Sequence, residues 1–208
     1  MTEKPSFSQY STPLASELSA LFSAIPDDDL LASLRTYYAG RKGYTHVVMW
    51  RTFLAMYYMN IPTFACLIRT SQDNPSLREV CGIDGLEGVP SPFAYSRFMK
   101  KLAKRGLKVK NILRNLTRRL FEILPDFGKS VAIDSTDMKA WSNGGKRGKK
   151  GKVSDPDAGW VVKTNTEGNR KYVWGFKAHI LADTKYELPI ALNVRRETST
   201  TPSGLQTY

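Results

Sequence analysis

The residue best placed to do chemistry is Asp134, which follows the short apolar run Ser130–Ile133. We expect this run to be a buried strand, with the carboxylate emerging at its polar end. A rigid strand end suits a hard cation such as Mg²⁺ or Mn²⁺, which takes carboxylate and phosphate oxygens. The competing interpretation is structural, because an aspartate after a strand often hydrogen-bonds the backbone of the next turn. Asp134 is therefore the candidate catalytic and metal-binding residue, with the structural role left open.

Positive charge gathers in two segments that could bind phosphate. Residues 97–119 hold ten lysines and arginines and no acid, and 144–152 is a loop rich in glycine and lysine. Like charges four residues apart on a helix repel, and phosphate binding relieves that repulsion. A solvated helix face is the alternative. The candidate DNA contacts are Arg97, Lys100, Lys101, Lys104, Arg105, Lys110, Arg114, Arg118, Lys146, Arg147, Lys149 and Lys150.

The composition agrees with a nucleic-acid partner. The 208 residues carry a net charge of +12, and the isoelectric point is near 9.7. No apolar stretch approaches the roughly 18 residues of a membrane span, and the N-terminus lacks a signal-peptide pattern. Two cysteines without a CxxC motif predict reduced thiols and no zinc site. We expect a cytoplasmic protein that associates with the nucleoid and has no membrane partner.

Residues 1–125 have the spacing of an all-helical domain. Apolar residues recur every three or four positions, and proline or glycine interrupts each run. The expected helices end at Pro26 and Gly40, span 45–60, begin at the caps Thr63, Asn74 and Ser91, and finish with a leucine-striped helix that Pro125 closes. Lys110, Arg114 and Arg118 fall on the opposite side of that last helix from its leucines.

The pattern changes to strands from residue 126. After the run that leads into Asp134, two apolar segments, Lys171–Ala182 and Leu188–Val194, flank Asp183–Lys185 like a hairpin around its turn. Between them and the first strand, Ser154–Trp160 predicts an Asx-type turn that docks Trp160 on the sheet. The sequence thus predicts an α+β chain: a helical domain over 1–125, then three strands over 126–208.

Four motifs in this order resemble the DDE-class insertion-sequence transposases. They are the Ile133–Thr136 run, the Ser154–Trp160 turn, the Gly175–His179 strand with its Leu188-Pro189 hairpin, and the helical stretch around Tyr57–Phe64, Asn74–Arg78 and Pro90–Phe98. Each motif is weak alone, and together they cover most of residues 45–195.

The resemblance implies a partial RNase H-like domain, with the first three strands of a mixed sheet that helices cover on both sides. The family's reaction is cleavage of DNA at the transposon end and attack of the freed 3′-hydroxyl on target DNA, with two metals held by three acids. Asp134 matches the first acid. The second aspartate and the glutamate would lie beyond Tyr208, so we expect a C-terminally truncated, catalytically incomplete chain. Asp183 matches the hairpin turn instead.

Two other functions stay open. One is a non-catalytic, transposase-derived DNA-binding protein that regulates transposition, and the other is an unrelated basic RNA-binding protein. Duplex DNA is the expected partner in both transposase readings, and a homo-oligomer is compatible with each of them. The presence of the two further acids separates the first reading from the regulator, and a preference for duplex DNA of defined sequence separates both from the RNA binder.

Overall fold

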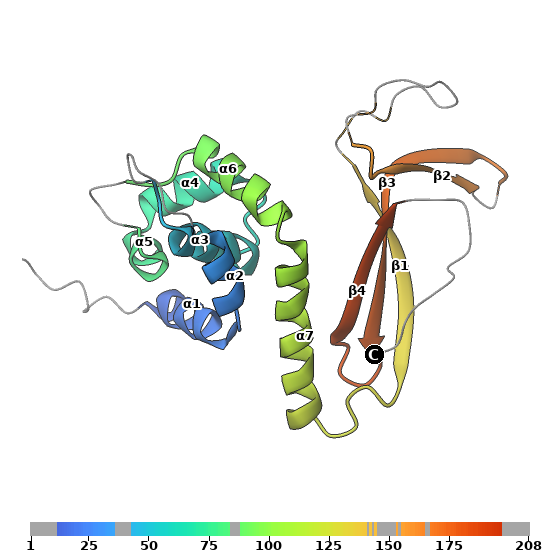
Figure 1. The fold of residues 1–208 in the computed structure, drawn as a ribbon, viewed down its shortest axis with the longest axis horizontal. Coiled ribbons are helices and arrows are strands. Elements are labelled where there is room, and N and C mark those ends of the chain that lie inside the picture. The colour runs from blue at the N-terminus through green and yellow to red at the C-terminus, as the bar shows by residue number, and fades with distance from the viewer. Residues whose placement is uncertain are drawn as a thin grey trace, which may run out of the picture. The chain divides into compact units, whose positions relative to one another are not determined.

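The chain packs as two compact units, residues 1–116 and 117–208. A computed structural model describes residues 12–35, 43–83, 88–140, 142, 144, 153, 155–164 and 167–196. The first unit is helical and the second holds a sheet, so the predicted α+β class is confirmed (Figure 1). No helix in these ranges is long and apolar enough to cross a membrane.

The helices begin where the sequence places capping residues. Their bounds are α1 Pro13–Ala24, α2 Asp28–Leu34, α3 His46–Tyr58, α4 Phe64–Asp73, α5 Pro75–Cys81, α6 Pro92–Ala103 and α7 Gly106–Ile123. The side chains of Thr63, Asn74 and Ser91 each accept a hydrogen bond from the backbone N–H three residues on, which satisfies one of the free donors of the first turn. Gly82 ends α5 in the left-handed conformation with φ of 77°. These predicted caps are confirmed.

Two helix ends differ from the prediction. Helix α2 ends at Leu34 rather than Gly40, because Arg35 adopts an extended backbone with φ −62° and ψ 119°. Gly40 itself, like Tyr37 and Tyr38, lies outside the described residues. Helix α4 begins after its predicted cap Thr63 and continues to Asp73, further than the short helix to Ile68 that its apolar residues predict.

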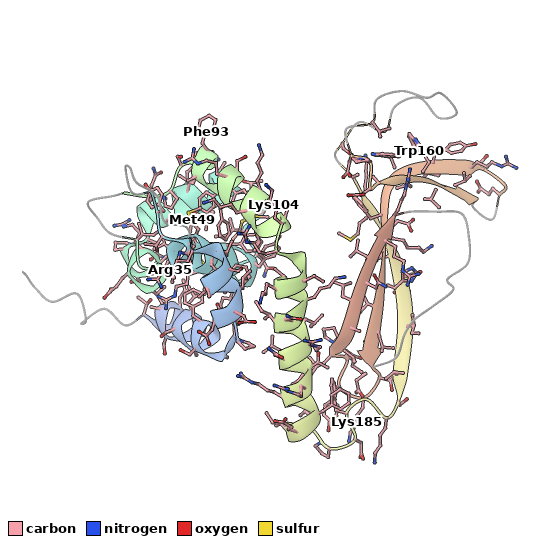
Figure 2. All side chains as sticks on the ribbon, in the orientation of Figure 1. Arg35, Met49, Phe93, Lys104, Trp160 and Lys185 are labelled. Atoms are coloured by element: carbon pink, nitrogen blue, oxygen red, sulfur yellow. The ribbon has the colours of Figure 1, made fainter. Side chains whose placement is uncertain are left out.

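Helix α3 is the central element of the helical unit. It buries Met49, Trp50 and Met56 in one apolar cluster with residues of α2, α4 and α6. It buries Val48 and Ala55 in a second cluster with residues of α1 and α5. Figure 2 shows Met49 among the helices. A helix apolar on both sides is typical of a buried core helix, so the other helices pack around α3.

The two cysteines are free thiols, as predicted. Cys66 is half-buried and Cys81 is fully buried. Burial raises the pKa of the Cys81 thiol to about 12. Cys81 therefore behaves as a small apolar core residue rather than a nucleophile.

The sheet has β3 at its centre. Its strands are β1 Val131–Lys139, β2 Gly159–Thr164, β3 Arg170–Asp183 and β4 Pro189–Arg196, and β3 pairs antiparallel with each of the other three. The predicted hairpin is confirmed as β3 and β4. Strand β1 is longer than predicted and is exposed along Val131–Ile133 rather than buried, because β3 covers only its edge. Strand β2 was not predicted as a strand. Within the described residues the pairing is antiparallel throughout; the mixed RNase H-like sheet stays a prediction.

Strand β3 changes partner at Gly175. One edge of β3 pairs with β2 over residues 170–175 and with β4 over residues 176–182, and the opposite edge pairs with β1 over residues 175–183. A Cβ atom on residue 175 would collide with the backbone carbonyl oxygen of Met138 in β1. Glycine is required here because β1 approaches the backbone of β3 too closely for any side chain. Figure 1 shows β3 bending as it leaves β2.

The Asp183 carboxylate joins the β3–β4 turn to the segment before β1. One carboxylate oxygen accepts a hydrogen bond from Gly128 N at 2.7 Å. The other accepts from the N–H groups of Lys185 at 2.9 Å and Tyr186 at 2.8 Å. The Tyr186 hydroxyl donates to the Pro125 carbonyl at 2.8 Å. These bonds fix the start of β1 beside the turn.

We predict that residues 1–125 fold on their own. Both apolar clusters of the helical unit draw only on side chains between Leu14 and Ile112, so this fragment contains the whole core. Circular dichroism should show a helical spectrum and one cooperative thermal transition. A spectrum of an unfolded chain would show that the strands belong to the same core.

We predict that Asp183→Asn destabilises the sheet unit. Burial raises the pKa of the Asp183 carboxyl, but the N–H groups of Gly128, Tyr186 and Lys185 and the Lys185 charge more than offset this, so the pKa lies below its ordinary value. The stabilisation is therefore fully present above the unfolded pKa of about 3.9 and is lost as pH falls through the folded value.

Urea unfolding between pH 2.5 and 7, followed by tryptophan fluorescence, measures both effects. The variant should unfold at lower urea at pH 7 and should lose less stability than the wild type as the solution is acidified. Replacement of the exposed Asp157 by Asn is the control. Equal midpoints for Asp183→Asn and wild type at pH 7 would remove this carboxylate from the stabilising contacts.

Candidate nucleic-acid interface

Helix α6 turns one side to the core and a basic side to solvent. Its buried residues are Ala94, Tyr95, Phe98 and Leu102. Arg97, Lys100 and Lys104 are exposed. At 100° per residue these three cations lie within one narrow row opposite the buried side. The packing of α6 therefore determines which of its residues face outward.

Helix α7 continues the acid-free stretch. Lys110, Arg114 and Arg118 are exposed and follow one another in steps of four, which places them on one side of the helix. No acidic residue occurs from Pro92 to Phe121. Seven exposed cations lie on α6, at its C-cap and on α7; Arg119 makes an interaction within the chain, and the other six have no ion-pair partner in the described parts of the chain. Their charges are thus left for a partner outside the described chain.

The junction of α6 and α7 is fastened to α2. The Arg105 guanidinium donates two hydrogen bonds to the Ser33 carbonyl, at 3.0 and 3.2 Å, and one to the Lys101 carbonyl at 3.3 Å. Lys108 forms an ion pair with Asp29 at 3.1 Å. Arg105 therefore positions the two helices, because its donors serve the last turn of α2. Its predicted contact with DNA stays a prediction.

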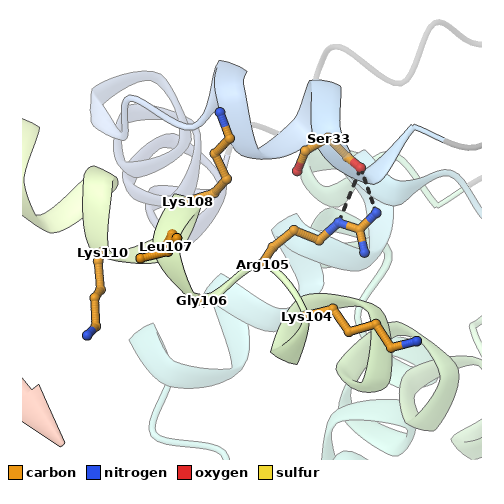
Figure 3. Close-up of a pocket in the computed structure, with 7 residues that line it drawn as sticks. All are labelled: Ser33, Lys104, Arg105, Gly106, Leu107, Lys108 and Lys110. Carbon is orange, nitrogen blue, oxygen red and sulfur yellow. Dashed lines mark hydrogen bonds between the residues drawn. The ribbon is translucent and has the colours of Figure 1, made fainter.

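A shallow pocket opens at this junction. It is lined by Ser33, Lys104, Arg105, Gly106, Leu107, Lys108 and Lys110. Figure 3 shows Arg105 reaching toward Ser33, while Lys104 and Lys110 extend away from that contact. The two extended lysines thus flank the point where α6 gives way to α7.

Burial and two nearby cations, Arg35 and Lys101, affect the pKa of His46. Burial lowers the pKa of His46, and the positive charges of Arg35 and Lys101 lower it further. His46 is the first residue of α3. The neutral form of this side chain is favoured, which is the response expected in a region of positive potential.

Asp134 lies in the middle of β1 rather than at its end, which corrects the prediction. Strand β1 continues to Lys139, because its polar residues Ser135–Asp137 pair with β3. The Asp134 side chain is exposed, and its Oδ1 accepts a hydrogen bond from Ser135 N at 2.7 Å. Its cross-strand neighbour is Ile180. The carboxylate therefore stands on an open, largely apolar part of the sheet.

The nearby acids do not join Asp134. Asp137 also lies within β1, because the strand extends past the end expected at Asp134, and three residues along a strand place Asp137 on the opposite face. Asp183 is buried and already accepts three backbone hydrogen bonds. Within the described ranges no three histidine, cysteine, aspartate or glutamate residues come together. These residues alone do not fit a two-metal site, which needs several carboxylate oxygens.

Two tryptophans hold the start of the basic loop. Trp160 donates from Nε1 to the Gly144 carbonyl at 3.2 Å, and Trp174 donates to the Ser142 hydroxyl at 3.0 Å. Their ring centroids are 5.4 Å apart. The docking of Trp160 and the Asx-type turn, in which Asp155 accepts from Asp157 N at 3.1 Å, are confirmed. Lys146, Arg147, Lys149 and Lys150 lie outside the described residues.

One exposed residue of α6 was not singled out from the sequence. Phe93 is 76% exposed, and Figure 2 shows it at the outside of the helical unit. The sequence does contain a signal for this exposure, because Phe93 lies four residues before Arg97 and therefore on the same side of the helix. Phe93 is in phase with the basic row and out of phase with the core residue Phe98.

Comparison with known proteins gives one match. Residues 6–101 match the family model described as "Transposase domain (DUF772)". The match spans α1–α5 and most of α6, and it supports a transposase-family protein. Searches of curated proteins and of solved structures gave no match.

We predict that the isolated chain does not cut DNA with Mg²⁺. One aspartate supplies two oxygens at most, and two metals about 3.5–4 Å apart need more to offset their repulsion. A nicking assay on duplex DNA should give the background rate for the wild type and for Asp134→Ala alike. Strong cleavage that disappears in Asp134→Ala would show that other residues of the chain complete a metal site.

Proposed function

We propose that this chain is a DNA-transposition protein that binds duplex DNA through exposed cations of α6 and α7. The observation that carries the proposal is the acid-free stretch from Pro92 to Phe121, in which six exposed cations have no ion-pair partner among the described residues. Residues 6–101, which overlap the start of this stretch, match a transposase domain. A transposase-family protein acts on DNA, so the family match and the charge favour the same partner.

A solvated helix face accounts less well for this charge. Exposed helices usually carry acids among their bases, because pairs of opposite charge four residues apart stabilise the helix and like pairs destabilise it. Lys110, Arg114 and Arg118 repel one another instead. Bound phosphates remove that repulsion and release counterions, so the arrangement favours a polyanion.

The sheet unit fits the beginning of an RNase H-like domain of the DDE class. Strands β1, β3 and β4 form an antiparallel group, with β3 between the other two. Asp134 would be the first acid of the DDE set and would hold a divalent cation, Mg²⁺ or Mn²⁺, together with acids that the described residues do not bring to it. The chain by itself would be catalytically incomplete.

The second candidate function is a non-catalytic, transposase-derived DNA-binding protein that regulates transposition. The isolation of Asp134 from other acids in the described ranges favours it. Such a protein would occupy transposon ends and compete with an active transposase. Competition without strand cleavage would identify this function, and restored cleavage when the missing acids are supplied would identify the first.

We predict a steep loss of DNA affinity with salt and a smaller loss in Arg114→Ala and Arg118→Ala. The slope of log K against log [salt] should fall by up to about 0.9 for each phosphate contact removed. Fluorescence anisotropy with a labelled duplex measures it. Arg69→Ala is the matched control, because Arg69 is an exposed arginine on α4. Unchanged slopes for both α7 variants would exclude this side of α7 from the interface.

A further inference from the structure

Helix α6 carries an aromatic side chain in line with its cations. Phe93, Arg97, Lys100 and Lys104 follow in steps of four, three and four. At 100° per residue they lie within about 60° of the helix circumference. The buried residues Ala94, Tyr95, Phe98 and Leu102 lie on the other side. Phe93 is thus the first member of an outward row whose other members are positive.

The exposure of Phe93 has no structural explanation in α6. Phe93 does not start the helix, because Ser91 is the N-cap and Pro92 is the proline of the first turn. The other aromatic residues of α6 have ring partners: Tyr95 stacks on Phe64 at 4.8 Å, and Phe98 meets Phe53 at 6.3 Å. Phe93 has no aromatic partner among the described residues and keeps 76% of its surface exposed. Single exposed apolar side chains are common on protein surfaces, so the exposure of Phe93 is informative because the ring lies in the basic row.

The charge of the row decides the kind of partner. Helix α6 contains no acid, and its three outward cations lack ion-pair partners in the described chain. A protein partner would need a matching acidic surface around an apolar pocket. Duplex DNA offers both features at once, because phosphates line each groove and thymine methyl groups lie on the floor of the major groove.

We propose that α6 enters the major groove of duplex DNA and that Phe93 contacts the C5-methyl group of a thymine. This inference rests on the proposed function and adds the helix and the side chain that recognise the DNA sequence. The groove is about 12 Å wide and admits an α-helix. In DNA-recognition helices the N-terminal residues reach the base edges, which is where Phe93 stands. Arg97, Lys100 and Lys104 then bind the flanking phosphates.

The experiment first selects preferred duplexes from a randomised pool with the full wild-type chain. The preferred site should contain at least one strongly required thymine. Phe93→Ala should prefer that thymine over the other bases about tenfold less than the wild type does. Its slope of log K against log [salt] should match that of the wild type. Phe93→Leu, which keeps an apolar side chain, should retain most of the preference. Tyr57→Ala, which removes a 66% exposed aromatic from α3, should change neither quantity.

A change in the DNA isolates the methyl contact. Replacing the required thymine by uracil removes only the C5-methyl group. The wild type should lose affinity for the uracil duplex, and Phe93→Ala should bind both duplexes equally. Equal losses of affinity in wild type and variant would overturn the inference, because the Phe93 ring and the thymine methyl group would then act independently.

Other results assign Phe93 elsewhere. If Phe93→Ala abolishes a DNA bend seen by gel mobility and leaves thymine preference intact, the ring is a minor-groove wedge and the inference is wrong. If it changes the oligomeric state and not the DNA preference, the ring contacts another protein chain and the inference is also wrong. A wild type that shows no salt-dependent DNA binding contradicts the proposed function itself. Steep salt dependence without thymine preference contradicts only the inference about Phe93.

Discussion

A single carboxylate, that of Asp183, holds the sheet unit in register. Its three backbone hydrogen bonds join the β3–β4 turn to Gly128, five residues after the end of α7 at Ile123. This contact sets Val131 opposite Asp183 and therefore every later pair of β1 and β3. A shift of one residue would move Asp134 to the other face of the sheet. The position of the candidate catalytic residue thus depends on an aspartate that does no chemistry itself.

Packing has the same role in the helical unit. The buried side of α6 is fixed by Tyr95 and Phe98, and Arg105 fixes the junction with α7 by binding the end of α2. With these contacts made, the outward direction of Phe93 and of the basic row follows from the helical repeat alone. The proposed interface is therefore formed by contacts within the chain before a partner binds, which would lower the entropy cost of binding.

Local chemistry was predictable and distant contacts were not. Thr63, Asn74-Pro75 and Ser91-Pro92 mark helix starts because a cap needs only its own first turn. Strand β2 escaped prediction because the turn residues before Trp160 dominate its sequence and its partner β3 lies further along the chain. In the sequence Arg105 is one more cation of a basic segment, and its structural role follows only from its contact with Ser33 in α2. Asp134 shows the same division: its strand was predicted, whereas its mid-strand position depends on pairing with β3.

The open apolar surface of β1 has a consequence for the behaviour of the purified chain. Val131 and Ile133 on one face of β1 are 46% and 56% exposed, and Met138 on the other face is 48% exposed. Such a strand is prone to self-association. The net charge of +12 opposes this by mutual repulsion of the molecules. Salt shortens the range of that repulsion to about 8 Å at physiological ionic strength. Colloidal stability should therefore fall as salt rises, and fall again near the DNA ratio at which the positive charge is neutralised.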